Sequence, residues 1–330
     1  MNIAIIGGGP AGLFAAYRLS EYKENNITIF EKGHDLDKRK CSVIDKTSDK
    51  CLNCSSCSIM NGIAGAGAFS DGKYNITTEF GGWLQNYIGE KATLRYEEES
   101  DSILTKFGAT SRYYNGSEEL KKLCLTHGLT MLQSKCRHLG TDSNYNVMLN
   151  MVNYLKSLPN VNIITDTTVD NCYKNKETDK WFITDSSKNI IGSEFDTVIF
   201  AVGRSGSSFF TDWCRHHNVK LENRQVDIGV RVELPYEIWE DFEKRIYEPK
   251  ILYKTKQYGD TIRMFCFNGR GEVVNENTDG IITVNGHSYE GEELKTNNTN
   301  FALLVAKTFL ETGKTNEELA ELLNMTSSTV

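Results

Sequence analysis

The sequence predicts an α/β protein, with a parallel sheet assembled from distant segments and a second lobe of α+β type. An apolar run at residues 3–6 is followed by a glycine-rich bend at 7–12 and a helix start of small residues, which is the pattern of a strand, a loop and a helix. A second apolar run, at 196–202, has the composition of a buried parallel strand and ends in another turn of small residues. From residue 227 onward the pattern alternates, which indicates a separate antiparallel sheet.

The chain of 330 residues is long enough for two lobes, because single hydrophobic cores stop growing at about 250–300 residues. The return of a strand at residue 196 makes the first domain discontinuous. We expect four parts: a first domain of residues 1–75 and 145–215, a helical insert at 76–144, an antiparallel-sheet substrate lobe at 216–310, and a C-terminal helix and tail at 311–330.

Composition excludes some classes of partner. The formal net charge is −7, and neutralising nucleic-acid phosphates needs a basic face, so we expect no nucleic-acid partner. No apolar stretch approaches the ~20 residues that cross a bilayer, and residues 1–20 lack a basic start and a cleavage site. We therefore expect an unprocessed, soluble, cytoplasmic protein that has no membrane partner and acts on a small-molecule substrate.

The spacing of the first glycines is typical of a loop that holds the pyrophosphate of a dinucleotide. Gly7 makes the tight turn, Gly9 lets the backbone approach the pyrophosphate, and Gly12 lets the helix pack on its strand. Pro10 and Ala11 begin the helix, whose free N–H groups and positive dipole end point at the phosphates. The strand before the loop and the helix after it make an ordinary glycine turn a poor explanation.

An acidic residue at the end of the second strand narrows the ligand. Glu31 stands about twenty residues after the glycines, where its carboxylate can accept hydrogen bonds from both ribose hydroxyls. A 2′-phosphate would be repelled there, which favours an FAD-like or NAD-like ligand. Lys32 and Arg39, which follow, complete the cofactor-binding candidates in this part of the chain.

Residues 33–60 are polar and rich in cysteine. Cys51, Cys54 and Cys57 are spaced Cys-x-x-Cys-x-x-Cys, and Cys41 lies upstream. Thiolates on one tight loop can converge on a metal, so these four residues are candidate ligands of an Fe–S cluster or a zinc ion. No proline closes the run and no second Cys-x-x-Cys pair exists, so redox-active thiols near a flavin and inert cysteines in a lid are alternatives.

A second glycine-dense stretch runs from residue 61 to residue 73. Small residues at almost every position indicate a backbone that passes close to a flat or bulky object such as an isoalloxazine ring, and a flexible glycine loop is the alternative. Phe69, Ser70 and Asp71 are the candidates that would line the flavin, and Lys73 adds a second polar group.

Short apolar runs after Pro159 predict a three-stranded antiparallel meander laid across the parallel sheet. Its strands are expected at 161–164, 167–174 and 181–184. The backbone near Val169 would then lie beside the adenine.

The strand that begins at residue 196 leads into a turn of small residues, where the backbone can approach the dinucleotide. Ala201, Gly203 and Arg204 are the candidates there. A domain that regains a strand so late is typical of FAD proteins rather than of simple NAD dehydrogenases, whose six strands run in one block.

The segment 227–310 is expected to form the antiparallel sheet, with strands at 227–233, 263–267 and 281–286. Its arginines would either clamp an acidic substrate or be surface charges, and the surface interpretation is favoured: Arg231, Arg263 and Arg270. His127 and His138, in the expected helical region, are interpreted as surface or satisfied histidines, so no catalytic acid or base is assigned.

Together these motifs resemble the FAD-dependent dehydrogenases called NAD(FAD)-utilising dehydrogenases, within the glutathione-reductase-like flavoprotein superfamily. The likeness covers about residues 1–305 and is carried by Gly7 to Gly12, Cys51-x-x-Cys54-x-x-Cys57, Gly65 to Lys73, Asp227 to Glu233, Arg263-x-Phe265-Cys266, and Asn300-Phe301-Ala302. It implies FAD binding and oxidoreductase activity, but it implies no substrate. We expect NAD(P)H as the electron donor.

The chain departs from this family at its end. Family members continue to a glycine-rich segment that closes over the flavin, whereas this sequence ends in a polar helix expected at 316–325 and a short tail. The expectation is a flavin site that is open or completed by a second chain. The alternatives to an FAD-dependent oxidoreductase are a truncated or split, non-catalytic FAD-binding subunit and an NAD-binding dehydrogenase.

Overall fold

The computed structural model describes residues 1–45, 47–52, 54, 56–222, 225–278, 281–289 and 291–308. The chain divides into two compact units. Unit 1 comprises Met1–Phe69, Met148–Glu222 and Asn277–Gly280, and unit 2 comprises Ser70–Val147, Asn223–Glu276 and Ile281–Val330. The helix expected at 316–325 and the tail lie outside the described residues.

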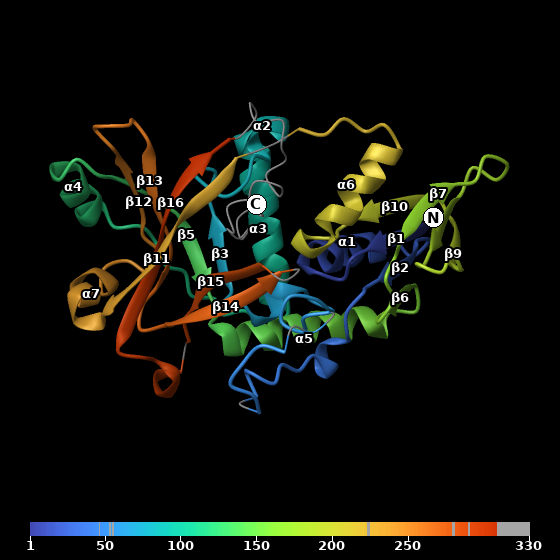
Figure 1. Cartoon of the computed structure of the whole chain (residues 1–330), viewed down its shortest axis with the longest axis horizontal. Coiled ribbons are helices and arrows are strands. Elements are labelled where there is room, and N and C mark those ends of the chain that lie inside the picture. Colours follow the sequence, from blue (N-terminus) through green and yellow to red (C-terminus); the bar gives the residue numbers. More distant parts are fainter. Residues whose placement is uncertain are drawn as a thin grey trace. The chain divides into compact units, whose positions relative to one another are not determined.

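A four-stranded parallel sheet is the centre of unit 1 (Figure 1). In the order β10-β1-β2-β6, its strands are β10 (Thr197–Phe200), β1 (Asn2–Ile6), β2 (Asn26–Phe30) and β6 (Val161–Ile164). All three pairings are parallel, and helix α1 (Pro10–Ser20) connects β1 to β2. The expected α/β class and the late return of a parallel strand are confirmed, although β10 is half-buried rather than fully buried.

A three-stranded antiparallel sheet packs on this parallel sheet. It consists of β7 (Asn171–Lys174), β8 (Trp181–Thr184) and β9 (Ile190–Phe195), and its residues Cys172, Ile183 and Phe195 share one core cluster with Ala4, Ile6 and Phe30. The predicted meander exists, but the prediction that residues 161–164 form its first strand is wrong. Residues 161–164 instead pair along β2 as a parallel strand, because helix α5 (Thr141–Ser157) precedes them and provides a crossover connection.

Unit 2 is built on a five-stranded antiparallel sheet of order β11-β16-β13-β12-β4. Its strands are β11 (Val226–Pro235), β16 (Asn298–Lys307), β13 (Thr261–Asn268), β12 (Lys250–Lys254) and β4 (Thr130–Leu132). Two further pairs are β3 (Lys73–Ile76) with β5 (Lys135–His138), and β14 (Glu272–Thr278) with β15 (Ile281–His287). The strand expected at 281–286 therefore belongs to a separate two-stranded sheet.

The helices are distributed over both units. Unit 2 holds α2 (Gln85–Ile88), α3 (Glu90–Lys106), α4 (Glu118–Thr126), α7 (Tyr236–Glu243) and the 3-10 turn η4 (Glu292–Leu294). Unit 1 holds α6 (Ser207–His216) and the turns η1 (Leu36–Lys38), η2 (Ala66–Phe69) and η3 (Arg204–Gly206). The segment 76–144, expected to be helical, also contains β4 and β5. No helix in the described ranges is long and apolar enough to cross a membrane.

Candidate functional site

The glycine loop between β1 and α1 is shaped by two close backbone contacts. Gly7 has a φ of +107°, and a Cβ atom there would lie 2.3 Å from the carbonyl oxygen of Ala201. A Cβ on Gly12 would lie 2.0 Å from the carbonyl oxygen of Gly7. Gly9 differs, because the nearest described protein atom to a Cβ there, the Cα of Gly65, is 4.0 Å away. Helix α1 begins directly after Gly9, with Pro10 in its first turn.

Glu31 links three parts of unit 1 through its carboxylate. Its Oε2 atom accepts a hydrogen bond from the backbone N–H of Gly8 at 2.8 Å. Its Oε1 atom accepts from the N–H groups of Gly33 at 2.9 Å and Gly62 at 3.0 Å. The residue is only 6% exposed. Sequence reasoning chose Glu31 for its contact with a ribose and missed this second role in fixing the loops around it.

Arg39 fixes the segment before the second glycine stretch. Its guanidinium donates to backbone carbonyl oxygens at 2.7–2.8 Å, which belong to Ser58, Ile59, Ile63 and Gly65. The same guanidinium lies 4.6 Å above the ring of Phe69. Two of the candidate cofactor residues thus contact each other, and Arg39 holds the backbone of this loop.

The segment that returns to the sheet meets the glycine loop at Ala201. The N–H of Ala201 donates to the carbonyl oxygen of Ile6 at 2.8 Å, so the end of β10 lies against the end of β1. Gly203 has a φ of +60°, and no described atom lies within 4 Å of where its Cβ would be. Arg204 begins η3, and the Nζ atom of Lys32 donates to the carbonyl oxygen of Ser205 at 3.0 Å.

Val169 is buried in the core that the two sheets of unit 1 share.

The candidate metal-ligating cysteines differ in exposure. Cys41 and Cys57 are half-buried, whereas Cys54 is exposed. Over the described ranges, no group of three or more histidine, cysteine or acidic side chains is arranged to hold a metal ion. The structure therefore does not bring the four candidate ligands together.

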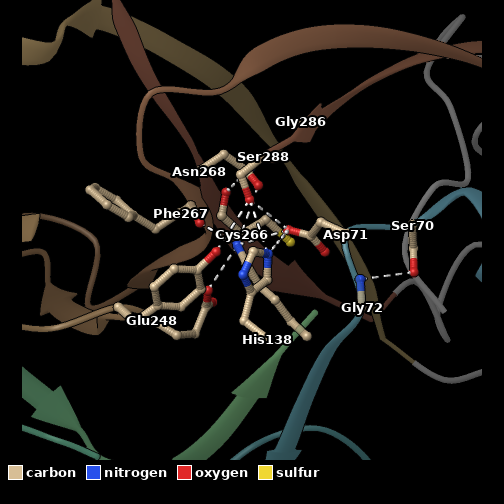
Figure 2. Close-up of polar contacts among 12 residues, drawn as sticks. Ser70, Asp71, Gly72, His138, Glu248, Cys266, Phe267, Asn268, Gly286 and Ser288 are labelled. Atoms are coloured by element: carbon tan, nitrogen blue, oxygen red, sulfur yellow. Dashed lines mark hydrogen bonds and ion pairs between the residues drawn. The ribbon is translucent and has the colours of Figure 1, made fainter. Parts of the chain in front are cut away.

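A second polar centre lies inside unit 2, where residues from distant segments meet (Figure 2). Lys73 is the first residue of β3 and pairs in register with His138, the last residue of β5. The other members lie before β3, before and at the start of β12, and after β15: Asp71, Tyr247, Glu248, Lys250 and Ser288. We call these seven residues the buried polar cluster.

Two lysines and two carboxylates form the charged part of the buried polar cluster. The Nζ atom of Lys73 lies 3.2 Å from Oδ2 of Asp71 and 3.0 Å from Oε2 of Glu248. Glu248 also pairs with Lys250 at 2.7 Å. Burial alone would lower the pKa of Lys73, but the two carboxylates raise it well above its usual value. Burial would raise the pKa of Glu248, and the two lysines lower it instead, so Lys73 and Glu248 form a charged pair at neutral pH.

A short hydrogen-bonded chain adjoins these charges. The hydroxyl of Ser288 donates to Oδ2 of Asp71 at 3.2 Å and lies 3.4 Å from both the hydroxyl of Tyr247 and Nε2 of His138. Burial lowers the pKa of His138 to about 4, so its imidazole is neutral at neutral pH. Burial also raises the pKa of Tyr247 well above its usual value. The neutral side chains of Ser288, His138 and Tyr247 can therefore form hydrogen bonds with a bound molecule without adding a charge to the site.

Sequence reasoning found part of this cluster for a different reason. Asp71 is predicted from the sequence to line a flavin, and in the structure its carboxylate pairs with Lys73. The interpretation of His138 as a satisfied histidine fits its burial, but its place beside Ser288 was missed. The available signal was weak: Glu248 and Lys250 are charged residues that flank an apolar strand, a pattern shared by many exposed strands.

The remaining candidates in unit 2 have partners of their own. Ser70 accepts hydrogen bonds at its hydroxyl from the N–H of Gly72 at 3.3 Å and from Asn144 at 3.4 Å. The three arginines considered for an acidic substrate do not converge, because they contact different groups: Arg231 contacts Asn300, Arg263 pairs with Asp227, and Arg270 pairs with Glu292.

Comparison with known proteins gives a matching domain family and one relative. Residues 5–37 match the family described as NAD(P)-binding Rossmann-like domain. Over 318 residues the chain is 26% identical to an uncharacterized protein of Clostridium beijerinckii. That match includes 91% of this chain and 50% of the relative, so the chain spans about half the length of the curated relative that it matches.

Solved structures of similar arrangement share little sequence with this chain. Glycine oxidase from Geobacillus kaustophilus aligns with a TM-score of 0.45 at 12% identity, covering 94% of this chain and 84% of the oxidase. NikD, described as an unusual amino acid oxidase, aligns with a TM-score of 0.41 at 10% identity, covering 98% of this chain and 75% of NikD.

Proposed function

We propose that unit 1 binds the ADP half of FAD and that the protein is an FAD-dependent oxidoreductase. The observation that carries the proposal is the difference among the loop glycines. Protein atoms fill the space where Gly7 and Gly12 would carry a side chain, whereas the space at Gly9 is open to 4.0 Å. A pyrophosphate fits in front of Gly9, where the first N–H groups and the positive dipole end of α1 would hold it.

Glu31 supports an adenine nucleotide without a 2′-phosphate. Backbone N–H groups use three of the roughly four lone-pair positions of its carboxylate. The remaining position, on Oε2, can accept a hydrogen bond from a ribose hydroxyl. The negative charge of the carboxylate would repel a phosphate at the same place, so a ligand such as FAD or NAD fits better than NADP.

The arrangement of unit 1 favours FAD over NAD. The domain is discontinuous, because β10 joins the sheet beside β1, and the antiparallel sheet β7-β8-β9 packs on it. Both features agree with the resemblance to FAD-dependent dehydrogenases. FAD supplies hydride or electron transfer when it is bound, and the residues of the chain bind and orient it. Phe69, Ser70 and Asp71 remain candidates for the flavin side. A small-molecule substrate and NAD(P)H as electron donor also belong to this proposal.

One observation favours a second candidate function. The domain family that matches residues 5–37 is described as NAD(P)-binding, which fits an NAD-binding dehydrogenase. The loop, the helix and Glu31 would serve NAD equally well, since both cofactors contain an ADP half. Separate titrations with FAD and with NAD decide between the two candidate functions.

The test is a titration of the purified full chain with FAD and, separately, with NAD. We expect FAD to bind, to give a yellow protein with absorbance at about 450 nm, and to be bleached by NAD(P)H or dithionite. The variant G9A should weaken FAD binding at least about tenfold, because its methyl group occupies the space for the pyrophosphate. The matched control is G82A, since Gly82 also lies in open space and has no left-handed φ.

The outcomes separate the alternatives. A protein that takes up no FAD contradicts the proposal, and a melting temperature raised by NAD but not by FAD supports the second candidate. FAD that binds and is reduced by dithionite but by no physiological donor would indicate an FAD-binding subunit without catalysis. Metal analysis of anaerobically purified protein tests Cys41, Cys51, Cys54 and Cys57 as Fe–S or zinc ligands.

A further inference from the structure

Unit 2 contains a cavity of about 310 Å³ next to the buried polar cluster. His138, Tyr247 and Ser288 belong to both the cavity wall and the cluster. This volume lies at the lower end of the range that is typical of small-molecule sites. The side chains that line it are mostly aromatic or charged, which favours a ligand that has both a ring and a charge.

One wall of the cavity is a column of rings. The ring of Tyr247 lies between that of Tyr114, at 4.3 Å between centroids, and that of His138, at 4.4 Å. The guanidinium of Arg112 caps the column, 4.6 Å from the centroid of Tyr114. Rings packed against each other lose little further freedom when a ligand binds, so this wall is preorganised for a flat molecule.

The charges around the cavity favour an anion. Three cationic side chains line it, against two carboxylates. Glu292 pairs with both Arg270, at 2.9 Å, and Lys295, at 2.6 Å. Glu243 accepts a hydrogen bond from the hydroxyl of Thr299 at 2.5 Å. Arg112 forms no ion pair with the residues that the structure describes, so its positive charge is available to a ligand.

From this geometry we propose that the cavity of unit 2 is a binding site for a small aromatic carboxylate, whose ring packs on the aromatic wall and whose carboxylate pairs with Arg112. The hydroxyl of Ser288 and the ring of His138 provide polar contacts at the opposite, buried end of the site. A phosphate fits less well, because a single unpaired arginine cannot neutralise a dianion. A phosphate also has no ring that could pack on the aromatic wall. The inference does not depend on FAD binding by unit 1.

The probe is benzoate, titrated calorimetrically into the full chain. We expect saturable binding with one site, and we expect R112Q to weaken it about tenfold or more because a charge-assisted hydrogen bond is lost. The matched control is R95Q: Arg95 also lies on the surface above a tyrosine ring, 4.8 Å from the centroid of Tyr96, but outside the cavity. This control variant should bind benzoate like the wild type.

Two further probes test the chemistry of the site. Benzyl alcohol lacks the charge and inorganic phosphate lacks the ring, so both should bind at least about tenfold more weakly than benzoate. The inference is overturned if benzoate does not bind, if R112Q and R95Q weaken binding equally, or if phosphate binds more tightly than benzoate. FAD titration of the same samples distinguishes the two proposals. FAD binding without benzoate binding would contradict the carboxylate site of unit 2 and leave the proposed FAD site of unit 1 supported.

Discussion

The Nζ atom of Lys73 lies 3.0 Å from Oε2 of Glu248 inside unit 2, and both side chains are almost entirely buried. Replacing Lys73 by methionine would leave Asp71 without its lysine partner and Glu248 with Lys250 alone. We expect K73M to lower the free energy of unfolding by about 3–5 kcal/mol, which is typical when one partner of a buried ion pair is removed. Urea denaturation followed by circular dichroism measures this change.

The control for this prediction is an exposed ion pair. Lys244 and Glu240 lie 2.9 Å apart, four residues apart on one helical surface, and both side chains face solvent. K244M should leave the free energy of unfolding almost unchanged, because exposed pairs contribute little. Equal effects of K73M and K244M would show that the buried polar cluster does not stabilise the fold through its charges.

The glycine loop was predictable from the sequence, and the buried polar cluster was not. The first strand, Gly7, Gly12 and Glu31 follow one another within a short segment, and each has a local reason that the sequence displays. Lys73 and Glu248 meet only because β3 and the start of β12 are brought together by the tertiary fold. The charges and their spacing in the sequence do not predict such a pairing.

The wrong assignment of β6 has a similar cause. A four-residue apolar run such as 161–164 can form a parallel or an antiparallel strand, and only its connections decide. The strand β9 was missed because its sequence, Ile190 to Phe195, contains a glycine and polar residues in place of an apolar run. The first difference concerns the pairing of a predicted strand and the second a strand that was not predicted, and neither changes the α/β fold of unit 1.

The stability of the protein should depend on pH through His138. Burial lowers the pKa of His138 to about 4 in the folded protein, whereas the unfolded value is near 6.5. Between these values the unfolded chain binds more protons than the folded one, so stability falls as the pH falls from about 6.5 to 4. The difference between the folded and unfolded pKa values of His138 corresponds to a change of about 3 kcal/mol in the free energy of unfolding. Chemical denaturation at pH 7.0 and at successively lower pH values, down to about 4.5, measures it.

The variant H138Q isolates this contribution. Glutamine does not titrate, so the slope of stability against pH in that window should become shallower than in the wild type. The mutation also lowers stability at pH 7 by removing the contacts of His138 with Ser288 and Tyr247. An unchanged slope in H138Q would assign the pH dependence to other groups.

Gly7 tests the packing of the glycine loop without any ligand. Its φ of +107° is unfavourable for alanine, and the added methyl group would lie 2.3 Å from the carbonyl oxygen of Ala201. We expect G7A to lower the free energy of unfolding by at least about 3 kcal/mol, since strain and collision add. G9A should cost much less, because the space at Gly9 is open. Equal losses of stability in G7A and G9A would contradict the geometry of the loop.

The buried thiols should be far less reactive than the exposed ones. Burial raises the pKa of Cys136 and of Cys172 to about 12, so at pH 8 only about one molecule in ten thousand carries the reactive thiolate at either position. Cys54 and Cys266 are exposed. We expect iodoacetamide to label these two residues in the native protein within the time that leaves Cys136 and Cys172 unlabelled, as measured by mass spectrometry of the digested peptides. In urea the difference in labelling rate should disappear, because it comes from burial. Rapid labelling of Cys136 in the native protein would contradict this prediction and show that β5 opens to solvent.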